Sequence, residues 1–222
     1  MGETNITQTF GQALIYFVPF LFALCFHEYA HGWMARMKGD RTAEIMGRLT
    51  LNPVAHVDIF GTIILPFMAL MFHFPFFGWA KPVPVNERNL KNPKKDMFWI
   101  ALAGPLSNIL LAFFAILALI ILLKFEAGSS AEGASEMLKV FMMVNLFLAV
   151  FNLIPLHPLD GGKVLARFLP DQLNDKLEQS QQVTSMMLMV LMITGAFRYL
   201  AYPVQWLAEI LWAVASSISG VI

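Results

Sequence analysis

Two histidines and a glutamate lie close together within a long apolar stretch of this 222-residue sequence. The segment reads HEYAH, from His27 to His31, with Glu28 directly after the first histidine. On a helix, residues four apart lie on the same face, one turn above each other. Two imidazoles at that spacing can bind one zinc ion, and Glu28 can act on a water molecule at the metal. The motif therefore predicts a zinc site with Glu28 as its catalytic base.

The alternative is a chance cluster of polar side chains that reach toward water near the end of a helix. On insertion scales, an ionisable residue at the centre of a bilayer costs about 2.5–3.5 kcal/mol. Three such residues occur here within one short motif. A bound metal reduces that cost because it neutralises charge and satisfies the lone pairs of the imidazoles. We therefore favour the metal site over the chance cluster.

A catalytic zinc ion needs a third protein ligand and an open position for water. Asp160 is the candidate, in the segment NLIPLHPLDGG from Asn152 to Gly162. The two prolines of this segment disfavour a regular helix, and the two glycines after Asp160 allow the backbone to turn tightly. A carboxylate at such a break can reach a pair of histidines on another helix. In the alternative interpretation, Asp160 caps a helix that begins at Gly161, and both interpretations could hold in part.

His157 is the competing third ligand, three residues before Asp160. It could instead be a polar partner of the metal site or a surface imidazole at the cytoplasmic boundary. His56 and His73 have no partner at ligand spacing, so we expect them at the membrane interface. Cys25 precedes His27 by two residues and faces largely away from the histidine face, which predicts a packed thiol.

The composition is that of a polytopic membrane protein. Hydrophobic residues make up 58% of the sequence and charged residues 14%, and the mean hydropathy is +0.64. An average soluble domain is about a quarter charged, so this chain has too few polar residues to cover a water-soluble surface. The formal net charge is zero, and we expect no nucleic-acid partner. A single cysteine excludes an intrachain disulfide and a cysteine-rich metal site.

Six apolar segments approach or exceed the roughly 20 residues that a helix needs to cross a bilayer. They cover residues 10–37, 59–77, 97–123, 137–154, 183–200 and 202–222, approximately. Lysine and arginine favour the cytoplasmic side of short loops. They follow the first segment, precede the third and follow the fourth. The sequence therefore predicts an external N-terminus, a cytoplasmic C-terminus and five full crossings.

The second apolar segment, residues 59–77, has basic loops on both sides, so a full crossing would leave one of these loops outside. It contains Pro66, and strand-like stretches border it at Gly47 to Pro53 and at Ala80 to Asn86. Non-helical backbone is tolerated at membrane depth where protein or a wet cavity surrounds it. We therefore predict a re-entrant segment. The expected fold is an all-α polytopic membrane protein, with a small membrane-embedded β element and five full transmembrane helices.

Three motifs together resemble the signature elements of the site-2 protease family of zinc intramembrane metalloproteases. They are HEYAHG, AGPLSN (Ala103 to Asn108) and NLIPLHPLDGG, and the connecting GRLTLNP and GWAKPVPVN are also similar to that family. The resemblance runs from about Phe26 to Gly162. It implies a three-helix catalytic core, a strand element beside the active site and cleavage of transmembrane substrates. It also implies Asn152 as a polar residue near the scissile carbonyl.

Two asparagines in the apolar segments have alternative roles. Buried amides ordinarily form hydrogen bonds between helices. For Asn108, helix packing beside Gly104 and a substrate contact remain equally open. Asn152 lies closer in the sequence to Asp160, and for this residue a role in the site is favoured, as a donor to the developing oxyanion.

These observations predict a zinc-dependent intramembrane endopeptidase with one Zn²⁺ per chain. His27, His31 and Asp160 bind the metal, and Glu28 and Asn152 are catalytic. We expect one membrane-embedded protease domain without PDZ or CBS modules, with a core at residues 10–162 and accessory helices at residues 183–222. Its partners are a transmembrane protein or peptide substrate and the lipid bilayer of a prokaryotic cell (inner) membrane, with the active site toward the cytoplasm. A metal transporter and an inactive membrane scaffold are the rival classes.

Overall fold

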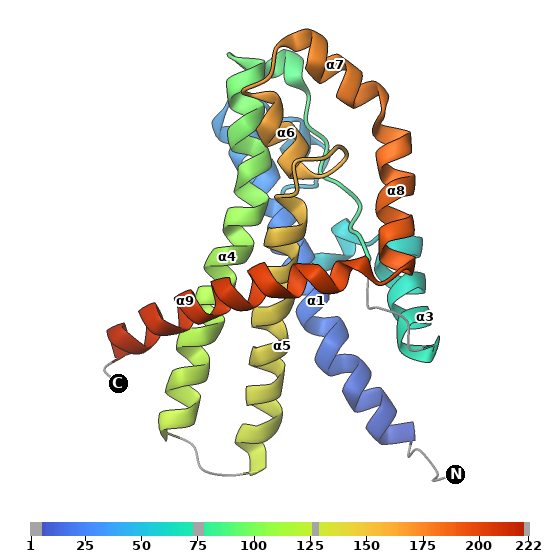
Figure 1. The fold of residues 1–222 in the computed structure, drawn as a ribbon. Coiled ribbons are helices and arrows are strands. Elements are labelled where there is room, and N and C mark those ends of the chain that lie inside the picture. Colours follow the sequence, from blue (N-terminus) through green and yellow to red (C-terminus); the bar gives the residue numbers. More distant parts are fainter. Residues whose placement is uncertain (1–5, 73–77, 126–128, 220–222) are drawn as a thin grey trace.

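The computed structural model describes residues 6–72, 78–125 and 129–219, and the fold within these ranges is helical (Figure 1). The α-helices are α1 (Ile6–Met37), α2 (Thr42–Ile45), α3 (Leu65–Phe72), α4 (Pro93–Phe125), α5 (Ser129–Asn152), α6 (Asp160–Ala166), α7 (Asp171–Gln179), α8 (Gln181–Ile193) and α9 (Ala201–Ser219). Shorter turns are the 3-10 helices η1 (Pro53–His56), η3 (Glu87–Asn89) and η4 (Ala196–Leu200), and the π-helix η2 (Ile59–Ile64).

Three long helices form the core of the molecule. Helix α4 packs against both α1 and α5, and α1 also contacts α5 (Figure 1). Among the described residues, these three are the helices long and apolar enough to cross a membrane, over Leu14–Met37, Pro93–Lys124 and Glu132–Asn152. The predicted all-α membrane fold is confirmed at this level.

Small residues allow the three long helices to approach one another. Ala23 of α1 is fully buried in a cluster with Leu148 of α5, and Ala112 of α4 is fully buried against Leu146 of α5. Lipid tails are as apolar as leucine, so close packing at small residues is a main source of attraction between membrane helices. This close packing brings the polar side chains of α1, α4 and α5 within hydrogen-bond distance of one another.

The second apolar segment forms a short, interrupted helix. η2 has six residues and α3 has eight, which together give about 21 Å at 1.5 Å per residue, short of the roughly 30 Å of a bilayer core. The chain then returns to its starting level, because Trp79 N donates to Gly61 O (3.1 Å) and Thr62 Oγ1 donates to Trp79 O (2.8 Å). Residues 73–77 of the predicted segment lie outside the described residues.

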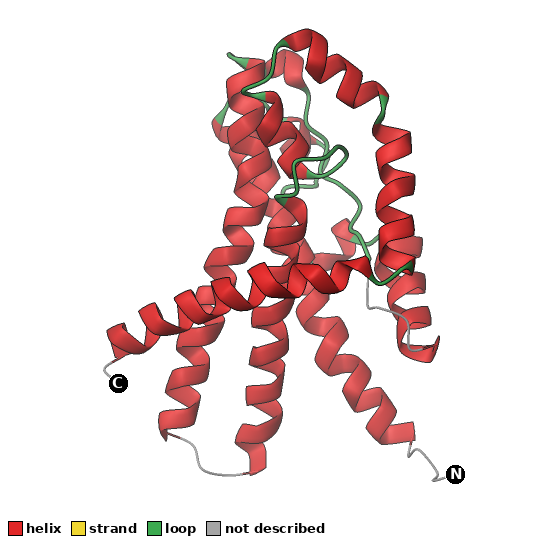
Figure 2. Ribbon diagram, viewed as in Figure 1, coloured by secondary structure: helices red, strands yellow, loops and turns green. Residues whose placement is uncertain are grey.

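The predicted β element is not confirmed, since no strand occurs in the described part of the chain (Figure 2). The stretches at 47–53 and 80–86 are joined by isolated contacts instead. Arg48 Nη2 donates to Lys81 O (2.7 Å), and Lys81 N donates to the carbonyl oxygen of His56 (2.9 Å), which follows the first stretch. Pro82 and Pro84 have no amide hydrogen, which removes two of the donors that a ladder would need.

The C-terminal helices are arranged differently from the prediction. Helix α9 runs across α4 and α5, with its Val204 in the cluster of Ala112 and Leu146 (Figure 1). The chain bends by 86° between α8 and α9. The described residues therefore contain three spanning candidates, or four if the bent pair is one broken span. The predicted count of five crossings is not confirmed.

Candidate metal centre

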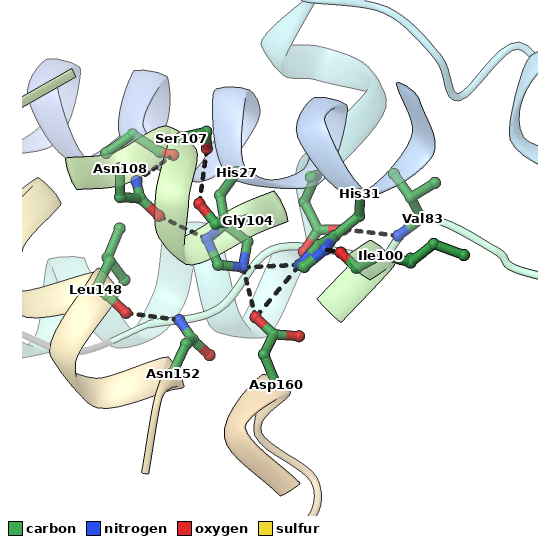
Figure 3. A network of polar contacts seen from close by, with 12 residues as sticks. His27, His31, Val83, Ile100, Gly104, Ser107, Asn108, Leu148, Asn152 and Asp160 are labelled. Carbon is green, nitrogen blue, oxygen red and sulfur yellow. Dashed lines mark hydrogen bonds and ion pairs between the residues drawn. The ribbon is translucent and has the colours of Figure 1, made fainter. Parts of the chain in front are cut away.

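Helix α1 presents both histidines of the HEYAH motif to one point beside α6. The Nε2 atoms of His27 and His31 lie 3.0 Å apart. Asp160 Oδ2 lies 3.1 Å from Nε2 of His27 and 3.3 Å from Nε2 of His31 (Figure 3). Only 6%, 12% and 12% of these side chains are exposed, in that order. The structure thus brings together the three residues that the sequence selected as metal ligands.

The outer nitrogen of each imidazole is bonded to an oxygen. His27 Nδ1 lies 2.6 Å from Asn108 Oδ1, and His31 Nδ1 lies 2.7 Å from the carbonyl oxygen of Ile100. Carbonyl oxygens only accept hydrogen bonds, so Nδ1 must be the donor in both rings. A neutral imidazole then has a lone pair on Nε2. Both lone pairs face each other and the Asp160 carboxylate.

This donor set fits a cation. Asp160 Oδ2 is buried and has no hydrogen-bond partner among the described residues. Two lone pairs and a carboxylate oxygen repel one another when no positive charge lies between them. Two histidines and one carboxylate are also a ligand set of catalytic zinc sites, in which a fourth position stays open. In the described part of the chain, this is the one cluster of three potential ligands.

Gly104 of α4 allows the helix backbone to lie directly against the two imidazoles. A Cβ atom at this position would lie 2.5 Å from the His31 ring and 2.7 Å from Cε1 of His27. Such contacts are too short for a real side chain, so any larger residue would displace the rings. The sequence analysis considered Gly104 only as a packing neighbour of Asn108. The AGPLSN motif thus supplies the space beside the histidines as well as a polar partner for one of them.

Asp160 reaches the histidines because a compact loop precedes α6. The helix begins at Asp160 and Leu159 takes the N-cap position, so the structure does not support the alternative in which Asp160 caps the helix. The two following glycines were expected to form a tight turn, but they lie within α6. Their function is close approach, since a Cβ on Gly161 would clash with backbone atoms of Leu153 and Ile154.

Glu28 contacts the segment that follows α3. Its Oε2 accepts a hydrogen bond of 2.7 Å from Val83 N. Val83 stands between Pro82 and Pro84, which have no amide hydrogen. Within Pro82 to Pro84 only Val83 has an N–H to offer Glu28, and the sequence alone did not predict this contact.

Asn152 and His157 precede Asp160 in the chain by eight and three residues. Asn152 ends α5, and its Nδ2 donates to Leu148 O (3.0 Å). Figure 3 shows Asn152 on the same side of the histidine pair as Asp160. His157 is 6% exposed, its Nε2 has no partner among the described residues, and it is not part of the cluster of ligand atoms.

The remaining candidates lie outside the cluster. Cys25 is fully buried, as predicted for a packed thiol. His56 is 1% exposed and its Nε2 donates to Thr50 O (2.8 Å), so its contact is structural, and its position at the membrane interface stays a prediction. His73 lies outside the described residues. Sequence reasoning missed Asn145, which is fully buried on α5 and bonds to Asn108. The signal that could have identified Asn145 is an isolated amide side chain within the apolar segment 137–154.

Comparison with known proteins gives one consistent description. The model of Peptidase family M50 matches residues 15–131 and 120–196. The chain is 33% identical over 189 residues to the "Putative zinc metalloprotease YwhC" of Bacillus subtilis, and the match covers 84% of this chain and 83% of YwhC. It is 28% identical over 204 residues to the "Putative zinc metalloprotease Rip2" of Mycolicibacterium smegmatis. That match covers 91% of this chain and 73% of Rip2. No solved structure gives a significant match.

Proposed function

This chain belongs to peptidase family M50, the family of the site-2 proteases, and on that premise we propose that it is a zinc-dependent intramembrane endopeptidase. The family membership predicted from three motifs is confirmed. The proposed substrates are membrane proteins cleaved in or near a transmembrane helix. We also propose one protease domain, with its core at residues 10–162 and accessory helices at residues 183–222.

One observation carries the proposal: Nε2 of His27, Nε2 of His31 and Oδ2 of Asp160 lie within 3.3 Å of one another, while Nδ1 of each ring already faces an oxygen. His27, His31 and Asp160 would hold one zinc ion per chain. When bound, zinc would polarise the substrate carbonyl and lower the pKa of the attacking water toward 7. The hydrogen bonds to Nδ1 fix the orientation of both imidazoles and raise their basicity.

Glu28 is the proposed general base. It follows His27 directly, and Val83 N holds one oxygen of its carboxylate at 2.7 Å. A carboxylate has two oxygens, so the second can take a proton from the attacking water and pass it to the leaving amine. The contact with Val83 would keep Glu28 in one orientation during that transfer, which is the usual benefit of a fixed catalytic group.

Asn152 is the proposed donor to the oxyanion that develops on the substrate. Its amide carries two N–H groups, and one of them is donated to Leu148 O. That bond orients the amide at the end of α5, eight residues before Asp160. A fixed donor aimed at the developing charge is worth about 2.7–4 kcal/mol in other acyl transfers.

The depth of the histidines supports cleavage within the membrane. They lie on the apolar span Leu14–Met37 of α1. At 1.5 Å per residue, His27 is about 20 Å from Leu14 and about 15 Å from Met37 along the helix axis. A peptide bond at that depth would belong to a substrate segment inside the bilayer or close to it. The short helix from η2 to α3, and the contact of Trp79 after it with Gly61 near its start, support the proposed re-entrant segment.

A metal transporter is the rival function. Transport needs polar groups at successive depths, whereas the described residues hold one cluster of potential ligands. The glutamate between the two histidines has a direct use in hydrolysis and none in a simple transport path. Both considerations favour the protease.

The test is cleavage of a helical transmembrane peptide by the purified full chain in liposomes. We expect one zinc ion per chain by elemental analysis, cleavage that stops on removal of the metal by a chelator, and recovery on addition of zinc. The same liposomes, loaded with a zinc-sensitive dye, report metal flux. Zinc flux without peptide cleavage would indicate a transporter and contradict the proposed protease. Cleavage that is unaffected by the chelator would show that the reaction does not need the metal.

A further inference from the structure

A directional chain of hydrogen bonds runs from α5 through α4 to the candidate metal centre. Asn145 Nδ2 donates to Phe141 O (2.8 Å), and Asn145 Oδ1 accepts from Asn108 Nδ2 (2.8 Å). Asn108 Nδ2 also donates to Ala23 O (3.2 Å), and Asn108 Oδ1 accepts from His27 Nδ1 (2.6 Å). Both asparagines are fully buried.

Two backbone carbonyls set the direction of this chain, Phe141 O at its far end and, through a longer bond of 3.2 Å, Ala23 O at Asn108. The carbonyl of Phe141 can only accept, so the Nδ2 side of Asn145 must face it and Oδ1 must face Asn108. Asn108 must then present Nδ2 to Asn145 and Oδ1 to His27. Because Oδ1 only accepts, the proton of His27 lies on Nδ1 and the lone pair lies on Nε2, toward Asp160.

We propose that Asn145 is a positioning residue that, through Asn108, holds the His27 imidazole in the tautomer that can bind the metal. This inference rests on the proposed zinc site. Asn145 does not touch the ligand atoms; its bond to Asn108 Nδ2 (2.8 Å), which is shorter than the bond from Asn108 Nδ2 to Ala23 O (3.2 Å), acts with it to prevent the amide of Asn108 from turning over. A reversed Asn108 would present Nδ2 to His27, favour a proton on Nε2 and block coordination.

His31 provides an internal comparison. Its Nδ1 bonds directly to the carbonyl oxygen of Ile100 (2.7 Å), a backbone acceptor that cannot turn over. His27 has a side-chain amide as its acceptor, and a terminal amide can exchange its nitrogen and oxygen by rotation. The hydrogen bonds of Asn108 to Asn145 and to Ala23 O supply for His27 the fixed polarity that one backbone carbonyl supplies for His31. Packing alone would not distinguish the two amide orientations, because nitrogen and oxygen have nearly the same size.

The test is the histidine tautomer in protein labelled with ¹⁵N only at histidine, of which the chain has five. Spectra are recorded on the metal-free full chain over a series of increasing pH, so that the tautomers are read from the signals of the neutral rings, and single substitutions at His56, His73 and His157 assist the assignment. We expect both His27 and His31 to carry the proton on Nδ1 in the unsubstituted protein. A proton on Nε2 of His27 would overturn the proposal without the need for any variant.

Asn145→Leu keeps the branched shape of the side chain, with two somewhat larger methyl groups at its end, and removes the acceptor. We expect the Nε2–H tautomer of His27 to become populated while the His31 signals stay unchanged, and zinc affinity to fall about 10–100-fold, the usual cost of losing a partner of a metal ligand. Leu146→Ala is the matched control, since this fully buried neighbour is apolar. It should lower stability and leave the His27 tautomer unchanged.

The rescue variant is Asn145→Leu combined with Asn108→Asp. Both oxygens of a carboxylate accept, so rotation at position 108 no longer matters, and zinc affinity should recover relative to Asn145→Leu alone. Equal effects on His27 and His31, or no rescue, would reduce Asn145 to a packing residue. If the unsubstituted chain binds no zinc but has the expected tautomers, the proposed zinc protease function is contradicted. The role of Asn145 in orienting Asn108 and His27 is then still supported.

Discussion

Asp40 and Asp160 are two buried carboxylates with opposite surroundings. Asp40, just after α1, is fully buried and surrounded by donors: it accepts from Thr42 N and Thr42 Oγ1 (3.1 and 2.5 Å), Asn86 N (2.8 Å) and Asn89 Nδ2 (2.8 Å). The Oδ2 atom of Asp160 is also buried, yet the atoms nearest to it are two imidazole nitrogens with lone pairs. A satisfied carboxylate stabilises a fold, whereas an unsatisfied one among other acceptors indicates a missing cation.

The comparison also separates two parts of the molecule. Asp40 ties the end of α1 to the turn around η3, in a region of ordinary loop contacts. Asp160 lies where three long helices and α6 meet, and its neighbours are held in place by further hydrogen bonds. The burial of a carboxylate therefore does not indicate its function; the number of donors around it does.

Removal of the Asp160 carboxylate should have the largest effect. Asp160→Ala takes away one of three proposed ligands, so zinc affinity should fall by more than the roughly 10–100-fold that loss of a ligand's hydrogen-bonding partner costs. His157→Ala is the control, because this histidine lies outside the ligand cluster. The measurement is competition for zinc with a chromophoric chelator. A larger loss of zinc affinity in His157→Ala than in Asp160→Ala would make His157, and not Asp160, the third ligand.

Glu28→Gln should remove catalysis and leave the metal in place. The amide is nearly the same size as the carboxylate but cannot take the proton, so cleavage of a transmembrane peptide should fall by about 10²–10⁴-fold. Zinc content should stay at one ion per chain, since Glu28 is not a proposed ligand. Unchanged cleavage would remove Glu28 from the mechanism, and a loss of zinc would make it a ligand.

Gly104→Ala tests whether the histidines need the space beside α4. The added methyl group would overlap both imidazole rings, so they must shift, and zinc affinity should fall by at least about tenfold, within the range for disturbed ligand orientation. Gly133→Ala on α5 is the matched control, because its methyl group would meet nothing within 4 Å. Equal zinc affinity in the two variants would show that α1 adjusts freely.

Asp40→Asn should give the smallest effect on the metal and a clear effect on stability. The new NH₂ group would face N–H and O–H donors, which should lower the free energy of unfolding by about 1–3 kcal/mol. Zinc content should stay unchanged. Thermal unfolding in detergent measures the first quantity and elemental analysis the second. A loss of zinc in Asp40→Asn would show that the surroundings of Asp40 also support the metal centre, and would contradict the separation of the two regions.

The stabilisation by Asp40 should also depend on pH. Burial alone would raise the pKa of this carboxyl, but hydrogen bonds from Thr42, Asn89 and Asn86 outweigh it and leave the pKa below its usual value. A lowered folded-state pKa means that the stabilisation is present above the unfolded pKa of about 3.9 and is lost as the pH falls through the folded value. The difference in unfolding temperature between the unsubstituted chain and Asp40→Asn should therefore shrink between pH 6 and pH 3.

The local pattern of the sequence determined much of this protein. Hydrophobic runs of spanning length predicted α1, α4 and α5, because a bilayer leaves the backbone few alternatives to a helix. The spacing of His27, Glu28 and His31 selected one face of α1 through helical geometry alone. The family resemblance then followed from three motifs in combination, none of which would identify the family alone.

Only the tertiary structure decided how these elements meet. That Asp160 and not His157 reaches the histidines depends on the fold of the loop before α6. The orientation of Asn108 toward His27 depends on two acceptors distant in the sequence, Ala23 O on α1 and Asn145 Oδ1 on α5. The absence of a β element among the described residues and the crossing of α9 over α4 and α5 are packing outcomes as well. Sequence patterns report the local preferences of the backbone, whereas the direction of a hydrogen bond between helices depends on where each partner lies in space.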